Sequence, residues 1–362
     1  MFAKSAKLAV VLGIAALALT ACTPPMPPEV KAALLEQTHT CISGNANVAA
    51  GEAMTDALTS IQGAMTGACS QMALTPVAPA AGSGADIWID SAKVPATECK
   101  PETTVPYALD AAVLAATLGN AGGLILSPAT AAGILDGSIT NWSDAKITAD
   151  NGGVEVANEP ITLLPTTDAL AVKAFGAWYH NLTGKNFDSS KLQPKAGFST
   201  TDLGGFPEGS VGLITNSVFT AYSVNAMVPP LAASILLDAK TQEQAVPDMS
   251  GIGSAGTQLA IKTAASGVSV SMNFAAKPIA PEGSDVAPTP YGAVYPVNLS
   301  LCGAGGTAKA TKVAHAVALY LLRQDSQGNL TNYIGLPEQL RAASLDVVSV
   351  GLPQPKLPNT SN

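Results

Sequence analysis

Residues 122–168 read GGLILSPATAAGILDGSITNWSDAKITADNGGVEVANEPITLLPTTD, and this stretch decides the fold class. Residues 123–126 form a short apolar run that predicts a strand. Ser127 and Pro128 follow and are typical of a helix start, because a serine side chain accepts free backbone amides and proline suits the first helical position. We therefore predict a strand, a tight turn and a short helix that ends before Gly137.

The same segment ends in a second strand and a second helix start. Residues 161–164 are again apolar, and Asp168 is well suited to cap a helix. The apolar residues that would share one face of this helix are Phe175, Trp178, Tyr179 and Leu182. Strand and helix therefore alternate through this part of the chain.

Similar patterns continue on both sides. Residues 52–65 carry methionine, leucine and isoleucine at helical spacing, which predicts an amphipathic helix with an apolar core face. Further strands are predicted at 86–89, 107–117, 210–214, 258–262, 267–273 and 293–300, and an apolar helix at about 309–323. Strands that alternate with helices favour an α/β fold with a mostly parallel sheet.

The N-terminus, MFAKSAKLAVVLGIAALALTAC, has the features of a secretion signal. Lys4 and Lys7 precede an apolar run that is too short to span a membrane. The run ends in Leu-Thr-Ala before Cys22 and resembles a bacterial lipobox. This resemblance implies a signal peptide over 1–21 and a diacylglycerol group on the Cys22 thiol, which anchors the protein to the membrane. The alternative is an ordinary signal peptide that happens to end near a cysteine.

We expect residues 22–40 to form a lipidated, Pro-rich linker and residues 351–362 a C-terminal tail. The protein would then be extracytoplasmic and lipid-anchored at the cell membrane. Its 362 residues are 47% hydrophobic and 12% charged, enough for a large core arranged in about two lobes.

The charge balance excludes one class of partner. The formal net charge is −8, and loss of two lysines with the signal peptide makes it −10. A nucleic-acid-binding domain carries a basic footprint instead, so we expect no nucleic-acid partner.

If Cys22 is lipidated, four cysteines are left, and three pairings are possible. Disulfides are favoured over free thiols in an oxidising compartment. Cys41–Cys69 would close a short loop around the helix predicted at 52–65. No C-x-x-C occurs and the three histidines are far apart, so we expect no metal site and no cofactor.

Other motifs have ordinary explanations. Gly251–Gly256 spells G-x-G-x-x-G, but no acidic residue follows about twenty positions later, so loop glycines are expected rather than a dinucleotide site. No serine occupies a nucleophile-elbow motif, so we expect no enzymatic activity. Trp88 either stacks on a ligand at a cleft or packs in the core, and the core is favoured by its apolar neighbours.

Four stretches, in this order, resemble elements of the periplasmic phosphate-binding proteins of ABC importers, a family with the type II periplasmic binding protein fold. They are LSPATAAGILDGSITNWSD (126–144), EPITLLPTTD (159–168), EGSVGLITNSVF (208–219), and YPVNLSL with GNLTNYIGLPEQL (295–301 and 328–340). The resemblance covers about residues 85–345, most of the chain after the signal peptide.

The resemblance implies a two-lobed α/β fold with mixed sheets flanked by helices and two crossover strands at the hinge. Lobe 1 would take 41–107 plus 291–350, and lobe 2 would take 108–290. Cys99 and Cys302 would lie near the crossovers, which favours a Cys99–Cys302 disulfide. The implied partners are an ABC permease and a small anion or other polar solute held between the lobes.

The loop that grips phosphate in this family is altered here. The family pattern is Arg-x-Asp-Gly-Ser-Gly-Thr, whereas residues 166–172 read TTDALAV. Asp168 matches, but Thr166 replaces the arginine, and Leu170 and Val172 replace the two hydroxyl residues. Loss of the arginine removes a charge-assisted contact worth about 1.5–3 kcal/mol.

The resemblance makes seven residues candidates for contact with a small ligand: Asn47, Ser83, Asp90, Ser91, Thr166, Thr167 and Asp168. Two hypotheses follow. The first is a solute-binding lipoprotein whose specificity has changed from free phosphate. The second is an envelope scaffold or accessory protein that keeps the fold and acts through contacts with other proteins.

Overall fold

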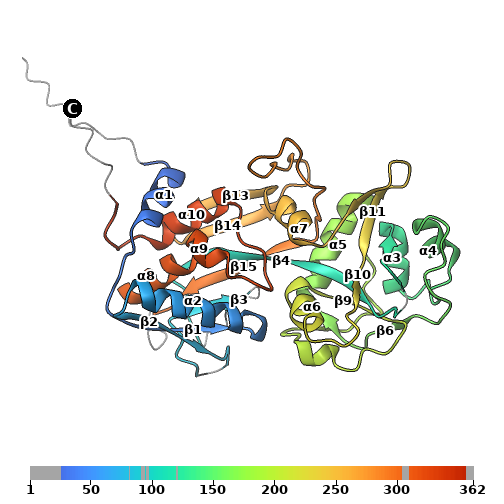
Figure 1. The fold of residues 1–362 in the computed structure, drawn as a ribbon, viewed down its shortest axis with the longest axis horizontal. Helices are drawn as coiled ribbons and strands as arrows, with labels where there is room; N and C mark the ends of the chain where they lie inside the picture. The colour runs from blue at the N-terminus through green and yellow to red at the C-terminus, as the bar shows by residue number, and fades with distance from the viewer. Residues whose placement is uncertain are drawn as a thin grey trace, which may run out of the picture.

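The computed structural model describes residues 26–80, 82–90, 94, 98–119, 121–303 and 310–355. These residues form two α/β lobes that lie side by side (Figure 1). A long strand, β4 (Thr103–Ala116), passes from one lobe into the other through the middle of the molecule (Figure 1).

Lobe 1 is built on a sheet with both parallel and antiparallel pairs. Its strands, in spatial order, are β13 (Leu259–Ala264), β14 (Gly267–Met272), β4, β15 (Val294–Leu301), β3 (Ile87–Asp90), β1 (Gly44–Ala50) and β2 (Met72–Val77). Its helices are α1 (Pro28–Gln37), α2 (Thr55–Ala68), α7 (Met249–Gly256), α8 (Lys312–Leu321), α9 (Gln324–Gln327) and α10 (Glu338–Val348), with the 3-10 turn η1 (Glu52–Met54). Helix α8 packs on β1 and β2, and α10 packs on β4 and β14.

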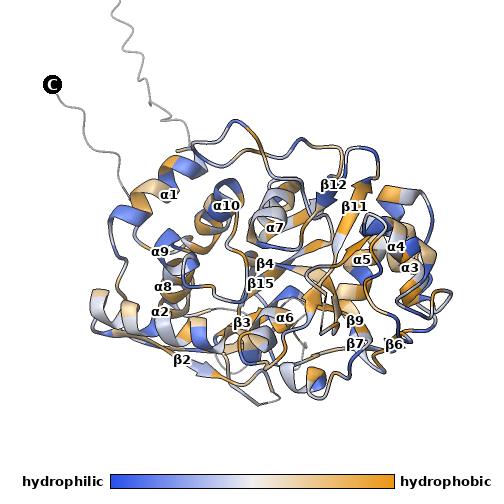
Figure 2. Ribbon diagram, turned by 45° about the vertical axis from the view of Figure 1, so that its right-hand side comes forward, coloured by the Kyte–Doolittle hydropathy of each residue, from blue (hydrophilic) through white to orange (hydrophobic). Residues whose placement is uncertain are grey.

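Lobe 2 uses the second half of β4. Its strands are β5 (Ile125–Leu126), β6 (Thr162–Leu163), β7 (Thr167–Asp168), β8 (Pro194–Lys195), β9 (Ser210–Thr215), β10 (Leu231–Ala232), β11 (Ser234–Asp238) and β12 (Glu243–Ala245). Its helices are α3 (Pro128–Leu135), α4 (Ala145–Asp150), α5 (Ala169–Thr183) and α6 (Asn216–Ser223), with the turn η2 (Thr200–Leu203). Strand β9 pairs with β4 over Ala112–Ala116, and α5 and α6 pack on β4. Figure 2 shows apolar residues along β9 and β11, in the interior of this lobe.

Several predicted elements are confirmed. Ser127 Oγ accepts the Thr130 amide at the start of α3, and Asp168 caps α5. The predicted helix face of α5 is correct for Phe175, Trp178 and Tyr179, which are buried, but wrong for Leu182, which is 37% exposed.

The two-lobed α/β fold with mixed sheets that the resemblance implied is confirmed, whereas the mostly parallel sheet expected from the alternation of strands and helices is wrong. Strands β15 and β9 both run antiparallel to β4, whereas β1 runs parallel to β2 and β3. Alternation of strand and helix along the chain suggested crossover connections. Later strands can pair with a crossover strand in either a parallel or an antiparallel direction. The order of the elements along the chain therefore did not determine the direction of each strand pair.

The boundaries of the lobes and of the linker also differ from those expected. Strands β13 and β14, placed in lobe 2 by the range 108–290, join the sheet of lobe 1. The glycines of Gly251–Gly256 lie in α7, which packs on β4 and β15, rather than in a loop. Part of the expected linker 22–40 is helix α1, which packs on α10.

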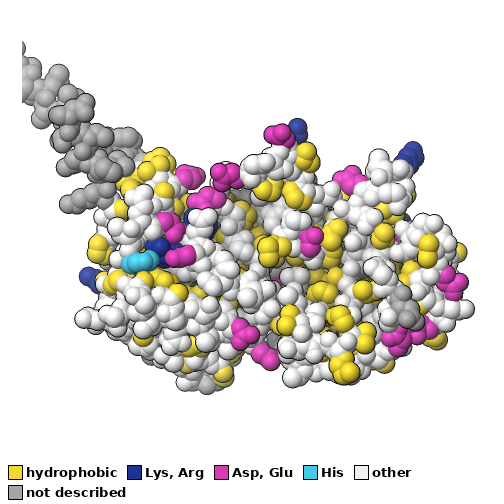
Figure 3. Space-filling model, viewed as in Figure 1, with side chains coloured by type: hydrophobic (Ala, Val, Ile, Leu, Met, Phe, Trp, Pro, Cys, Tyr) yellow, Lys and Arg dark blue, Asp and Glu magenta, His cyan; other side chains and the backbone are white. Residues whose placement is uncertain are grey.

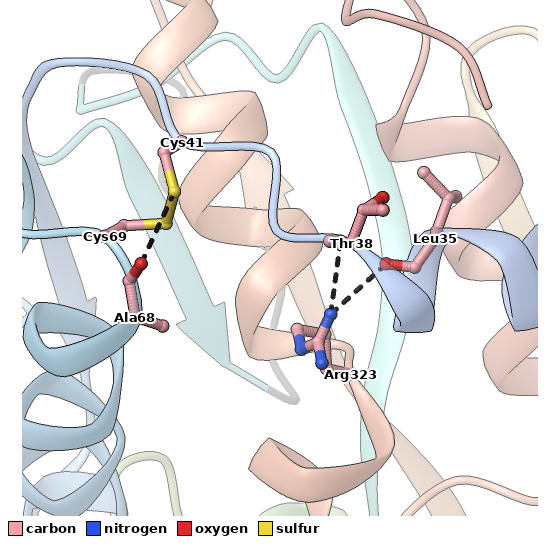
Figure 4. Close-up of a disulfide and its surroundings, with 6 residues drawn as sticks. All are labelled: Leu35, Thr38, Cys41, Ala68, Cys69 and Arg323. Atoms are coloured by element: carbon pink, nitrogen blue, oxygen red, sulfur yellow. Dashed lines mark hydrogen bonds between the residues drawn. A yellow bond between two sulfur atoms is a disulfide. The ribbon is translucent and has the colours of Figure 1, made fainter.

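Helix α1 is fixed to lobe 1 by ion pairs at its two ends. Lys31 Nζ lies 2.7 Å from Asp346 Oδ1, and Glu36 pairs with the buried Arg341. Figure 4 shows the Arg323 guanidinium beside the end of α1, where it donates to the carbonyl oxygens of Leu35 and Thr38. Arg341 is buried and breaking a buried ion pair is costly, so its pair with Glu36 holds this end of α1 in place.

Both predicted disulfides are present. Cys41 joins the segment after α1 to Cys69 at the end of α2 (Figure 4), with 5.4 Å between their Cα atoms. Cys99 joins Cys302 over the same Cα separation, 5.4 Å. Residues 1–25, and with them the signal peptide and Cys22, lie outside the described residues. Among the helices of the described residues, none combines the length and apolar character that a membrane crossing requires.

Candidate functional site

A cavity of about 590 Å³ lies between the two lobes. Lobe 1 contributes the turn after β1, the end of β3 and Tyr333. Lobe 2 contributes the start of α5, residues 195–200 and the junction of β9 with α6. Across the cavity, Thr200 Oγ1 donates to Glu52 Oε1 over 3.2 Å and joins the two lobes. The volume is within the range of small-molecule sites.

Asp110, in the middle of β4, is the central carboxylate of this cavity. It is the one charged residue of a strand that is otherwise almost entirely buried and apolar. Its Oδ1 accepts the amides of Ala111 (2.8 Å) and Ser217 (3.0 Å), and its Oδ2 accepts Ser217 Oγ (2.6 Å). Burial raises the pKa of the Asp110 carboxyl to about 7, even though these hydrogen bonds favour its charged form.

Asp168 is the second buried carboxylate. Its Oδ1 accepts the amides of Leu170 (2.8 Å) and Ala171 (3.0 Å), because it caps α5. Burial raises the pKa of the Asp168 carboxyl, the two amides oppose this shift, and the charge of Asp90 adds to it. Asp90, at the end of β3, therefore lies close enough to Asp168 for the two charges to interact.

Two tyrosines complete the centre of the site. Tyr295 on β15 is paired in register with Asp110 on β4, so the two residues sit opposite each other. Among the described residues its buried Oη has no hydrogen-bond partner, although Asp110 is near. Tyr333 lines the cavity, and burial together with the charges of Asp110, Asp90 and Asp168 raises the pKa of its hydroxyl.

Few positively charged side chains line the cavity. Of its described lining residues, Lys195 is the one cation, and its Nζ lies 2.7 Å from Asp202 Oδ1. Four carboxylates line the same space: Glu52, Asp90, Asp110 and Asp168. Figure 3 shows acidic side chains spread over the visible face and few basic ones. The site is therefore electrostatically negative.

The structure brings two of the seven predicted site residues to the cavity, Asp90 and Asp168. Thr166 and Thr167 do not line it, and the buried Thr167 donates to the carbonyl of Leu213. Asn47 lies within β1, where its backbone amide donates to Asp86, and Ser83 has a buried Oγ away from the cavity. Ser91 lies outside the described residues.

Sequence reasoning missed Asp110, Ser217 and Tyr333. One signal was available, because an aspartate within a long apolar strand is costly to bury unless it has partners or a function. Trp88, by contrast, belongs to the core: it is 3% exposed and packs in the cluster around Cys99 and Cys302.

The structure thus combines two lobes, a shared central strand and a cavity between the lobes. The structure resembles PfluDING, a high-affinity periplasmic phosphate-binding protein bound with phosphate, at 13% identity over 87% of this chain and 100% of that one, with a TM-score of 0.52. It also resembles a human phosphate-binding apolipoprotein at 14% identity over 82% of this chain and 93% of that one, with a TM-score of 0.52.

These comparisons show that the chain has the fold of periplasmic phosphate-binding proteins. Both neighbours are described as phosphate-binding proteins. No family model matches the sequence, and no curated protein matches it significantly.

Proposed function

We propose that the chain is an extracytoplasmic, lipid-anchored solute-binding protein that holds its ligand in the interlobe cavity and presents it to an ABC permease. We further propose that its specificity has changed from free phosphate. The observation that carries the proposal is the cavity itself, which is lined by both lobes and by the strand that joins them.

The start of α5 supports the change of specificity. Helix N-termini bind phosphate through free backbone amides. Here the amides of Leu170 and Ala171 already donate to Asp168, and the Leu170 side chain lines the cavity. The sequence supplies Thr166 in place of the family's arginine, and Lys195 is paired with Asp202. Phosphate would therefore meet carboxylates and few donors, which disfavours its binding.

Isothermal titration calorimetry on the full chain, purified in detergent, tests this proposal. We expect inorganic phosphate to bind with a dissociation constant no tighter than about 1 mM, which corresponds to roughly −4 kcal/mol. We expect a different small polar solute to bind in the cavity. Micromolar binding of phosphate would overturn the change of specificity, and the absence of any small ligand would overturn the transport function.

The alternative is a binding-deficient scaffold that acts through protein contacts. It is favoured by a second, more apolar cavity of about 610 Å³ on lobe 1, beside α7 and the start of α10. Met249 and Ile279 on its border are 71% and 52% exposed. Crosslinking in intact membranes distinguishes the two functions, because a transport role predicts permease subunits among the products and a scaffold role predicts other envelope proteins.

A further inference from the structure

We propose that the interlobe cavity binds an organic cation, an amine or guanidinium compound, whose charged head lies between Asp90, Asp110 and Asp168. This inference rests on the proposed solute-binding function, because it names the ligand class of the same cavity.

The three carboxylates come from different parts of the fold. Asp90 ends β3 in lobe 1, Asp168 caps α5 in lobe 2, and Asp110 lies on the strand that joins the lobes. All three line the cavity. Within the described part of the chain, Asp168 Oδ2 accepts no hydrogen bond, because both helix amides use Oδ1. A carboxylate oxygen is therefore available to a donor at the centre of the site.

The Tyr295 hydroxyl is a second observation that points to a ligand. Tyr295 Oη is buried close to Asp110, Asp168 and Tyr333, and no described residue forms a hydrogen bond with it. A buried hydroxyl without a partner costs free energy, and a ligand N–H group can donate to its oxygen. The Tyr333 and Phe198 rings line the same cavity, and aromatic rings attract organic cations.

The arrangement fits an organic cation better than a metal ion. Within the described residues, no group of three or more acidic, histidine or cysteine side chains is placed to hold a metal. The carboxylates are instead distributed around a cavity of about 590 Å³ that includes apolar residues such as Leu170 and Val297. A charged head with a carbon skeleton would satisfy both parts of this lining.

The test is calorimetry on the full chain with choline, putrescine, spermidine and agmatine, each at matched ionic strength. The comparators are the neutral carbon isostere of choline and inorganic phosphate. We expect at least one cation to bind, and Asp168→Asn and Asp90→Asn each to weaken that binding by about 30-fold or more. Asparagine is also a good helix cap, so Asp168→Asn leaves α5 capped. Asp285→Asn is the matched control, because it removes the same charge from an exposed loop residue that does not line the cavity.

Three outcomes are distinguishable. Cation binding that is weakened by the two cavity variants and unchanged by Asp285→Asn supports the proposal. Binding of phosphate or a neutral solute without any cation overturns the proposal and leaves a solute-binding function in place. If none of the probes binds, both the cationic ligand and the solute-binding function are overturned.

Discussion

Ser217 Oγ donates to Asp110 Oδ2 over 2.6 Å, and this hydrogen bond ties the first turn of α6 to the middle of β4. The Ser217 amide donates to the other carboxylate oxygen. One residue of lobe 2 therefore satisfies both oxygens of the buried charge at the hinge. The hydrogen bond is charge-assisted when Asp110 is ionised.

Replacing Ser217 should cost stability because Asp110 would lose one of its donors. We expect Ser217→Ala to lower the free energy of unfolding by about 1.5–3 kcal/mol at pH 8, where Asp110 is charged. Urea denaturation followed by circular dichroism measures this change. Ser269→Ala is the control, because Ser269 is exposed on β14, and a change below about 0.5 kcal/mol is expected there. Equal effects of the two variants would contradict the prediction.

The stability of the protein should fall as the pH rises from about 4 to about 7. The pKa of Asp110 is about 7 in the folded state, against an ordinary aspartate value of 3.8, so the folded state keeps a proton that the unfolded chain releases. The stabilisation is complete below the lower value and is lost as the pH rises through the higher one. The titratable residues that face Asp110 are Asp168, Tyr295 and Tyr333. Among these three, Asp168 is the one carboxyl, and its pKa is also raised.

Asp110→Asn removes this titration. Its free energy of unfolding should depend less on pH between about 4 and 7 than that of the unchanged chain. Chemical denaturation at several pH values gives both curves. Parallel curves would show that another group causes the pH dependence.

The two disulfides should differ in their effect on stability. Cys99–Cys302 closes a separation of 203 residues, and Cys41–Cys69 closes one of 28 residues. In the chain-entropy treatment the longer loop stabilises by about 2 kcal/mol more. We therefore expect the Cys99→Ala/Cys302→Ala variant to unfold at a lower temperature than the Cys41→Ala/Cys69→Ala variant. The reverse order in differential scanning calorimetry would contradict this expectation.

Two glycines give opposite expectations for replacement by alanine. Gly267, at the start of β14, has φ +145°, and a Cβ there would overlap the carbonyl of Thr104. Gly267→Ala should therefore destabilise the fold by about 2 kcal/mol or more. Gly63 lies within α2 with no atom near its missing Cβ, so Gly63→Ala should stabilise by about 0.5–1 kcal/mol. Urea titration of both variants checks the two signs.

Lipidation of Cys22 is a prediction from the sequence alone. Cys22→Ser should move the protein from the membrane fraction to the soluble extracytoplasmic fraction, because the thiol that carries the acyl chains is gone. Fractionation with metabolic labelling by a radioactive fatty acid measures both properties. Labelling that persists in the variant would contradict lipidation at this residue.

Local signals predicted local structure well. Ser127 and Asp168 were identified as helix caps because capping depends on a few adjacent residues. The position of the β13–β14 hairpin was missed because its assignment to a lobe depends on pairing with β4 at Thr104, more than 150 residues away. Sequence patterns report which residues are apolar, but they do not report which sheet edge receives a hairpin.

The centre of the candidate site was only partly predictable. Asp168 and Asp90 were found because each lies in a segment that resembles a motif of the phosphate-binding proteins. Asp110 was overlooked because its strand was interpreted as uniform core. Its contacts with Ser217 and its position opposite Tyr295 connect residues more than 100 positions apart, which appear together only in the fold.

The position of β15 between β3 and β4 has a consequence for biosynthesis. Both neighbours of this strand are made well before it, because β4 ends at Ala116 and β15 begins at Val294. The facing edges of β3 and β4 therefore stay unpaired while the ribosome makes lobe 2. Unpaired edges invite association with other chains. Newly made copies of this protein should depend on chaperones until residue 301 has emerged, and a nonsense mutation anywhere in lobe 2 should yield insoluble fragments.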